Sequence, residues 1–309
     1  MRTKLLLSTL LLFFLIGTSY GQGFVFRVLA SKGENKVKKG ENGETVPLKT
    51  GATLMSGDEL IAASGAYIGL MHKTGRTIEV RTSGVTKISD LETKLASSQS
   101  SVASKYATFV MNKMNEDDAG VNTNYRANMK ATGAVTRAAA GGAINVKLPS
   151  SVNVLNAEAI VEWSSVSEKV DNPTYIVSIE NIFEEEIYST ETNNTTLAIN
   201  FDDDKLSSER LVILNVKVKG NSELVSEDVG IKRMSEEDAA SINESLNALK
   251  ADVPLDDSPL NRLVYASFYE ENNLLLDAVT QYQKAIELSG GVEDFQNFYN
   301  DFLIKNNLQ

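Results

Sequence analysis

The sequence predicts a multi-domain, mainly β protein that ends in an α-helical cap. Short runs of alternating polarity, separated by turn-prone Gly, Asn and Asp, predict the β part. Apolar residues at helical spacing behind capping residues predict the cap. The expected segments are 1–21, a signal peptide; 22–90, a first β-module; 91–142, a helix and linker; 143–232, a β-sandwich; and 233–309, a helical region.

The first residues have the pattern of a secretory signal peptide. Arg2 and Lys4 precede the apolar run Leu5–Ile16. Small residues, Ser19 and Gly21, then stand before a cleavage site. No later segment approaches the roughly 20 apolar residues of a membrane-spanning helix. The chain has no cysteine, which suits a bacterial periplasm. We expect an exported protein that is soluble after cleavage and is periplasmic or associated with the outer membrane.

Charge divides the chain into two unlike halves. Residues 22–147 carry 17 Lys and Arg against 11 Asp and Glu, a balance of +6. Residues 148–309 carry 11 against 30, a balance of −19. Because phosphate groups repel such an acidic surface, nucleic acid and anionic lipid are poor partners for the second half.

The first β-module is punctuated by glycine turns. Gly51, Gly57 and Gly75 are expected to supply the positive φ of tight turns. The charged segment Lys32–Glu44 is expected to be a loop. The expected strands are 24–29, 46–48, 59–62, 67–71 and 77–81.

These strands and turns resemble the FecR-type domain of bacterial envelope proteins. The matching parts are Leu48-Lys49-Thr50-Gly51, Gly57-Asp58-Glu59-Leu60, Ile68-Gly69-Leu70-Met71 and Thr77-Ile78-Glu79-Val80. The hairpin carries Lys73-Thr74-Gly75 where the family usually has Asp-Gly. The resemblance implies a cell-envelope protein, and the domain combination resembles exported proteins of Bacteroidetes-type bacteria.

Residues 89–114 change to helical spacing and predict a helix that lies against a neighbouring domain. Its apolar residues are Leu91, Leu95, Val102, Tyr106, Phe109 and Val110. Residues 115–142 lack periodicity and predict a linker or long surface loop.

The second β-module has its own set of strands. We expect them at 159–163, 175–179, 186–190, 196–201 and 210–218. The only tryptophan, Trp163, ends an early strand and Tyr175 opens the next. This arrangement resembles an immunoglobulin-like or fibronectin type III-like sandwich, in which such a Trp fills the core.

The last 75 residues predict helices. Ser235 caps the first of them, and residues 292–306 form the last. Between them, one helix pair resembles a tetratricopeptide repeat, without the family's early Trp and with Gly290 in place of the closing Pro. The matching positions are Ala266, Tyr269, Ala278, Tyr282 and Ala285.

The inventory of catalytic groups is nearly empty. His72 is the only histidine, so no typical zinc site or Ser-His-Asp triad can form around a second one, and we expect a surface hairpin residue. The acidic runs Glu184–Glu186 and Asp202–Asp204 lack EF-hand spacing and predict solvated turns. We expect no enzyme, cofactor or metal.

The sequence favours a non-enzymatic protein–protein interaction or scaffold module, with other envelope proteins as partners and an undetermined oligomeric state. Binding through strand edges, the helical cap or both is expected. The aromatic candidates for an exposed interaction surface are Tyr265, Tyr269, Phe295, Phe298, Tyr299 and Phe302. Envelope-glycan binding is the alternative, although Trp, the usual sugar platform, is scarce. An accessory role in FecR-type signalling ranks third, because that role normally needs a membrane span.

Overall fold

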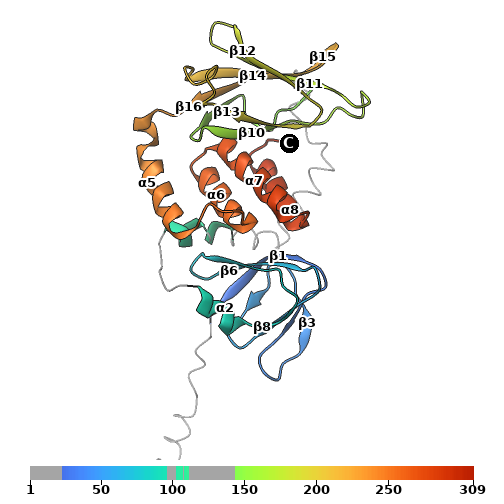
Figure 1. The fold of residues 1–309 in the computed structure, drawn as a ribbon, viewed down its shortest axis with the longest axis vertical. Helices are drawn as coiled ribbons and strands as arrows, with labels where there is room; N and C mark the ends of the chain where they lie inside the picture. Colours follow the sequence, from blue (N-terminus) through green and yellow to red (C-terminus); the bar gives the residue numbers. More distant parts are fainter. Residues whose placement is uncertain (1–22, 96–101, 107, 111–142) are drawn as a thin grey trace, which may run out of the picture.

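The computed structural model describes residues 23–95, 102–106, 108–110 and 143–309. The predicted signal peptide and the 115–142 linker lie outside these residues. The described chain is mainly β with a C-terminal helical cluster, as predicted. The first β-module and the sandwich lie at opposite ends of the molecule, and the C-terminal helices lie between them (Figure 1).

The first β-module consists of two four-stranded sheets, ordered β4-β1-β6-β7 and β3-β2-β5-β8. Its own core includes Phe26, Val28, Leu60, Ile68 and Leu70. The elements are β1 (Phe26–Lys32), β2 (Lys36–Lys38), β3 (Thr45–Pro47), β4 (Thr53–Leu54), β5 (Glu59–Ala62), β6 (Tyr67–His72), β7 (Thr77–Val80), β8 (Gly84–Lys87) and α2 (Ile88–Lys94).

Two details of this module differ from the sequence prediction. The segment Lys32–Glu44 is not all loop, because β2 pairs with both β3 and β5 and buries Val37 among its lysines. Gly51 and Gly75 have positive φ angles of 86° and 92°, as predicted, but Gly57 is not among the residues with positive φ. The Gly57 turn therefore does not depend on left-handed backbone.

The helix predicted over residues 89–114 is broken: α2 ends at Lys94, Leu95 is extended, and Leu91 packs in the first module's own core. A second helical stretch lies against the C-terminal helices. Residues 102–106 and 108–110 are helical, and Ala103, Tyr106 and Val110 are buried. The ring of Tyr106 meets that of Phe268 edge-on, with centroids 5.0 Å apart. The apolar side of this helix therefore contributes to the main core, as its spacing indicates.

The sandwich packs a two-stranded sheet, β10-β13, on a larger sheet ordered β12-β11-β14-β16-β9, in which β15 also pairs with β14. Trp163 is 1% exposed and meets the ring of Tyr175 at 5.5 Å, so it fills the core as predicted. The strands are β9 (Ser151–Val154), β10 (Glu158–Glu162), β11 (Tyr175–Glu180), β12 (Glu186–Thr192), β13 (Thr196–Asn200), β14 (Leu211–Val218), β15 (Asn221–Val225) and β16 (Val229–Arg233).

Four helices complete the chain: α5 (Glu236–Asp252), α6 (Pro259–Glu271), α7 (Leu275–Ser289) and α8 (Glu293–Lys305). The side chain of Ser235 accepts the N–H of Asp238 and caps α5, as predicted. Helices α6 and α7 pack closely because small residues meet between them: Ala266, Ala278 and Ala285 are fully buried.

Strand β6 joins the first module to the helices. All six of its residues are buried, because one face lies on the module's own core and the other packs against the helical region. Tyr67 meets Phe295 of α8 edge-on, with centroids 5.9 Å apart. The lack of a side chain at Gly69 lets α6 approach β6 closely, because a Cβ at this position would lie only 2.9 Å from Cδ2 of Leu260.

Polar contacts reinforce this junction. The backbone N–H of Ser31 donates to Asp294 at 3.1 Å, and the hydroxyl of Ser258 donates to Glu79 at 2.7 Å. Thr77 adds a bond from its hydroxyl to the side-chain oxygen of Asn261. The first module is therefore fixed to the C-terminal helices by packing and by directional bonds.

Replacing Gly69 with Ala should weaken this junction. The added methyl group meets Leu260 closer than van der Waals contact allows, so we expect the free energy of unfolding to fall by about 1–3 kcal/mol. Gly57→Ala is the control, because its Cβ would have nothing nearer than a backbone atom at 4.0 Å. Urea unfolding measures both, and equal changes in the two variants would contradict the close approach.

Candidate strand-binding edge

The six aromatic side chains predicted to form an exposed surface are all buried, at 9% exposure or less: Tyr265, Tyr269, Phe295, Phe298, Tyr299 and Phe302. They are buried because the helices that carry them lie between two β-modules and touch both. Phe295 contacts Tyr67 of the first module, whereas Tyr299 bonds to Glu162 of the sandwich. The prediction of an exposed aromatic patch is wrong, and these rings pack within the chain.

Helix α7 binds the sandwich through a buried carboxylate. Asp277 accepts the backbone N–H of Leu155 at 2.9 Å and that of Asn156 at 3.0 Å. The side-chain amide of Asn156 also donates to it, at 2.6 Å. Burial raises the pKa of Asp277 to about 6, and these donors oppose the rise. The carboxylate thus satisfies the backbone of the loop that follows β9.

The same helices cover strand β10. The N–H of Ile160 donates to the Thr280 hydroxyl at 2.9 Å. Glu162 accepts the Tyr299 hydroxyl at 2.5 Å and the side-chain amide of Gln283. Burial and the Glu162 charge raise the pKa of Tyr299, which keeps its hydroxyl a donor. Strand β10 is therefore paired on one side with β13 and bonded on the other to α7.

The pairing of β13 with β10 fixes which way its backbone groups point. The two strands are antiparallel over all five residues of β13, with no register shift. Just past the strand, the N–H of Trp163 donates to the carbonyl of Thr195 at 3.0 Å. Hydrogen-bonded pairs alternate along an antiparallel ladder, so Leu197 and Ile199 also direct their N–H and C=O groups at β10.

The intervening residues of β13 therefore point their backbone groups away from the sheet. These residues are Thr196, Ala198 and Asn200, of which the last two are exposed. The Asn200 carbonyl accepts the N–H of Asp203 at 3.1 Å in the following turn. Among the described residues, the outward groups of Thr196 and Ala198 have no hydrogen-bond partner. The outer side of β13 is an open strand edge.

This edge has none of the features that usually block strand addition. Proteins protect edge strands with charged residues, proline or bulges, and β13 has no charge, no proline and a regular register. The neighbouring edge strand β12 is different. It carries Glu186 and Glu191, and its pairing with β11 has a register shift at Ile179/Glu180. Strand β13 is the better acceptor for an added strand.

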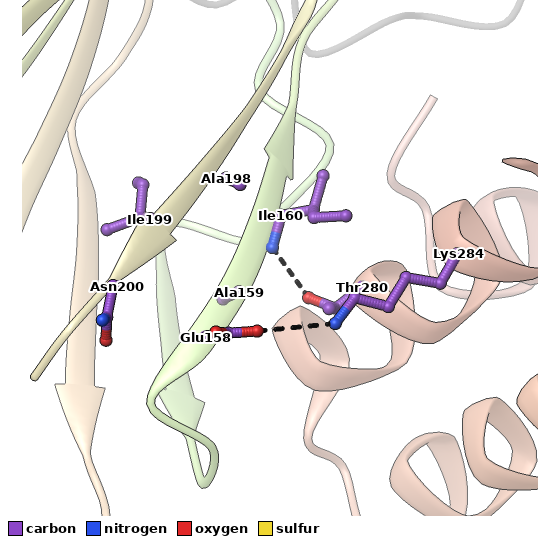
Figure 2. A pocket seen from close by; sticks show the side chains of 8 residues that line it. All are labelled: Glu158, Ala159, Ile160, Ala198, Ile199, Asn200, Thr280 and Lys284. Atoms are coloured by element: carbon purple, nitrogen blue, oxygen red, sulfur yellow. Dashed lines mark hydrogen bonds and ion pairs between the residues drawn. The ribbon is translucent and has the colours of Figure 1, made fainter. Parts of the chain in front are cut away.

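A cavity of about 220 Å³ lies between the β10-β13 sheet and α7, on the β10 side of β13 (Figure 2). Its lining residues are Glu158, Ala159, Ile160, Ala198, Ile199, Asn200, Thr280 and Lys284. At its rim, Nζ of Lys284 lies 3.7 Å from Oε2 of Glu158, whose side chain is 75% exposed. Ala198 and Asn200 of β13 line the side of the cavity that lies farthest from α7.

The structure also corrects the prediction for His72. Its exposed fraction is 7%, because its ring packs edge-on against Phe26, with centroids 5.2 Å apart. Its Nδ1 lies 2.7 Å from the Thr74 hydroxyl, which ties it to the hairpin. Burial and the nearby Lys73 lower the pKa of this histidine. His72 is a packed residue of the hairpin rather than a surface one.

No family model, curated protein or solved structure matches this chain. Among the described helices, none combines the length and apolar character needed to cross a bilayer. The sequence pattern predicts β13 and indicates strand edges in general as binding sites. It did not single out this edge, because that depends on the order of strands in the sheets.

The buried Asp277 should give unfolding a specific pH dependence. A folded-state pKa raised from 3.8 to about 6 stabilises the protein at low pH, and this contribution is lost as the pH rises through about 6. The difference corresponds to roughly 2.4 kcal/mol between pH 4 and pH 7. We expect Asp277→Asn to remove that loss and the exposed control Asp257→Asn to retain it.

Chemical denaturation at pH 4, 5, 6 and 7 measures this slope directly. Parallel pH curves for the wild type and Asp277→Asn would show that the carboxylate keeps an ordinary pKa.

Proposed function

We propose that this protein is a non-enzymatic interaction module of the cell envelope that binds an extended segment of a protein partner along strand β13. The observation that carries the proposal is the unpaired, uncharged and regular outer edge of β13. Strand addition to such an edge supplies affinity through main-chain hydrogen bonds, and neighbouring pockets supply specificity through alternate side chains.

The surroundings of β13 support this mode of binding. Helix α7 holds β10 in place through Thr280, so the acceptor strand rests on a fixed neighbour. The exposed carboxylate of Glu158 at the rim of the cavity favours a basic side chain there.

The envelope location is supported by the leader-like pattern of the first residues and by the absence of cysteine. Protein binding has more support than glycan binding. The only tryptophan is buried in the sandwich core, so it offers no platform on which a sugar ring could stack.

Site-specific photocrosslinking in the cells that make the protein tests the proposal. With a benzophenone amino acid in place of Ala198, we expect a discrete protein adduct after irradiation. The same amino acid in place of Ser189, exposed on the neighbouring edge strand β12, is the matched control. A protein adduct with the benzophenone at position 189 but none with it at position 198 would contradict strand binding at β13.

A further inference from the structure

We propose that the strand bound by β13 is β13 of a second copy of this chain, paired antiparallel about a two-fold axis at Ala198. This inference rests on the proposed strand-binding function and names the partner. The two β10-β13 sheets would then join as one four-stranded sheet, ordered β10-β13-β13-β10. A two-fold contact of this kind uses the same surface on both copies and closes on itself.

The hydrogen-bonding groups of β13 are self-complementary in this register. Ala198 lies opposite Ala198 of the second copy, and Thr196 lies opposite Asn200 of the second copy. All of these residues point their N–H and C=O groups outward. Each such antiparallel pair can exchange two N–H···O bonds. The unpaired outward groups of Thr196 and Ala198 in one copy would thus bond to the other copy, and the Asn200 carbonyl, which already accepts the N–H of Asp203, would accept a second bond.

Other registers fit less well. Moving the axis to Leu197 or Ile199 still allows hydrogen-bonded pairs, Thr196 with Ala198 or Ala198 with Asn200, but it pairs only three residues of each strand with strand residues of the other copy. Moving it to Thr196 or Asn200 pairs the end of one strand with turn residues of the other. The axis at Ala198 alone pairs all five strand residues with strand residues.

The charge distribution permits this contact despite the acidic character of residues 148–309. Strand β13 has no charged side chain. The ladder would end at Asn200, because the chain turns directly after it, so Asp202 and Asp204 lie outside the paired residues. No carboxylate faces a carboxylate across the new ladder, so the like-charge repulsion that destabilises directly opposed pairs is avoided.

Side-chain packing also favours a second copy. Leu197 is half-buried at the edge of the sandwich core, and in this register it lies opposite Ile199 of the second copy. Such non-hydrogen-bonded pairs bring side chains closest together, so the contact would cover the remaining apolar surface of Leu197. Dimerisation would also extend the two-stranded β10-β13 sheet, a size of low intrinsic stability, to four strands.

Because Ala198 faces its own copy, a charge-swap experiment tests the register. Ala198→Glu or Ala198→Lys alone places like charges opposite one another and should raise the dimer dissociation constant about tenfold or more, a change of 1.4 kcal/mol. An equimolar mixture of the two variants places opposite charges together and should recover the dimer. Sedimentation equilibrium of purified residues 22–309 measures the dimer dissociation constant of the wild type, of each variant and of the mixture.

The control variants are Ser189→Glu and Ser189→Lys on β12, which should dimerise like the wild type. Circular dichroism and the urea midpoint show that each variant is folded. A wild type that is monomeric at about 100 μM, or a dimer whose dissociation constant does not respond to charge at position 198, would overturn the inference.

The photocrosslink at position 198 separates the two proposals. An adduct of twice the monomer mass supports self-pairing, an adduct with a different protein leaves strand binding alone standing, and no adduct contradicts both.

Discussion

The arrangement of this molecule depends on the side chains of α7 that satisfy partly buried backbone groups of the sandwich. Asp277 accepts two N–H groups of the Leu155–Asn156 loop, and Thr280 accepts that of Ile160. Buried backbone donors without partners are costly, so the sandwich needs α7 in order to be complete. The main apolar core accordingly runs without interruption from the sandwich into the helices.

That docking determines which surfaces remain for binding. Because α7 and α8 are held between the β-modules, the aromatic side chains of the helical region pack internally. The same contacts cover the outer side of β10 and leave that of β13 open. The helices therefore bury their aromatic residues within the chain and cover β10, while β13 keeps an open edge.

Much of the fold follows from local sequence pattern. The positions of β5, β11 and α5 follow from alternation and capping, and the core position of Trp163 follows from its place at a strand end. Strand β2 is not predicted from the sequence, because its lysines are typical of a solvent-exposed loop. Its extended conformation depends instead on pairing with β3 and β5. Strands β9 and β16, which pair in parallel across about eighty residues of sequence, were also missed. Such pairing leaves little local signal.

The binding edge was harder to predict than the fold. An exposed edge is a property of strand order, and nothing in the residues 196–200 distinguishes an edge strand from a central one. The aromatic residues failed as predictors for a related reason. Their number indicates a large apolar surface, but only the position of the first module shows that the chain itself covers that surface.

The bond between Ser31 and Asp294 joins residues 263 positions apart. The first module, which is synthesised first, thus lacks its final contacts until the last helix, α8, is available. Contacts so distant in sequence make folding slow, and they leave the helix-facing side of β6 uncovered for most of that time. A chain that lost α8 would leave Tyr67 on that side of β6 without its cover, and uncovered apolar surface of this kind promotes aggregation.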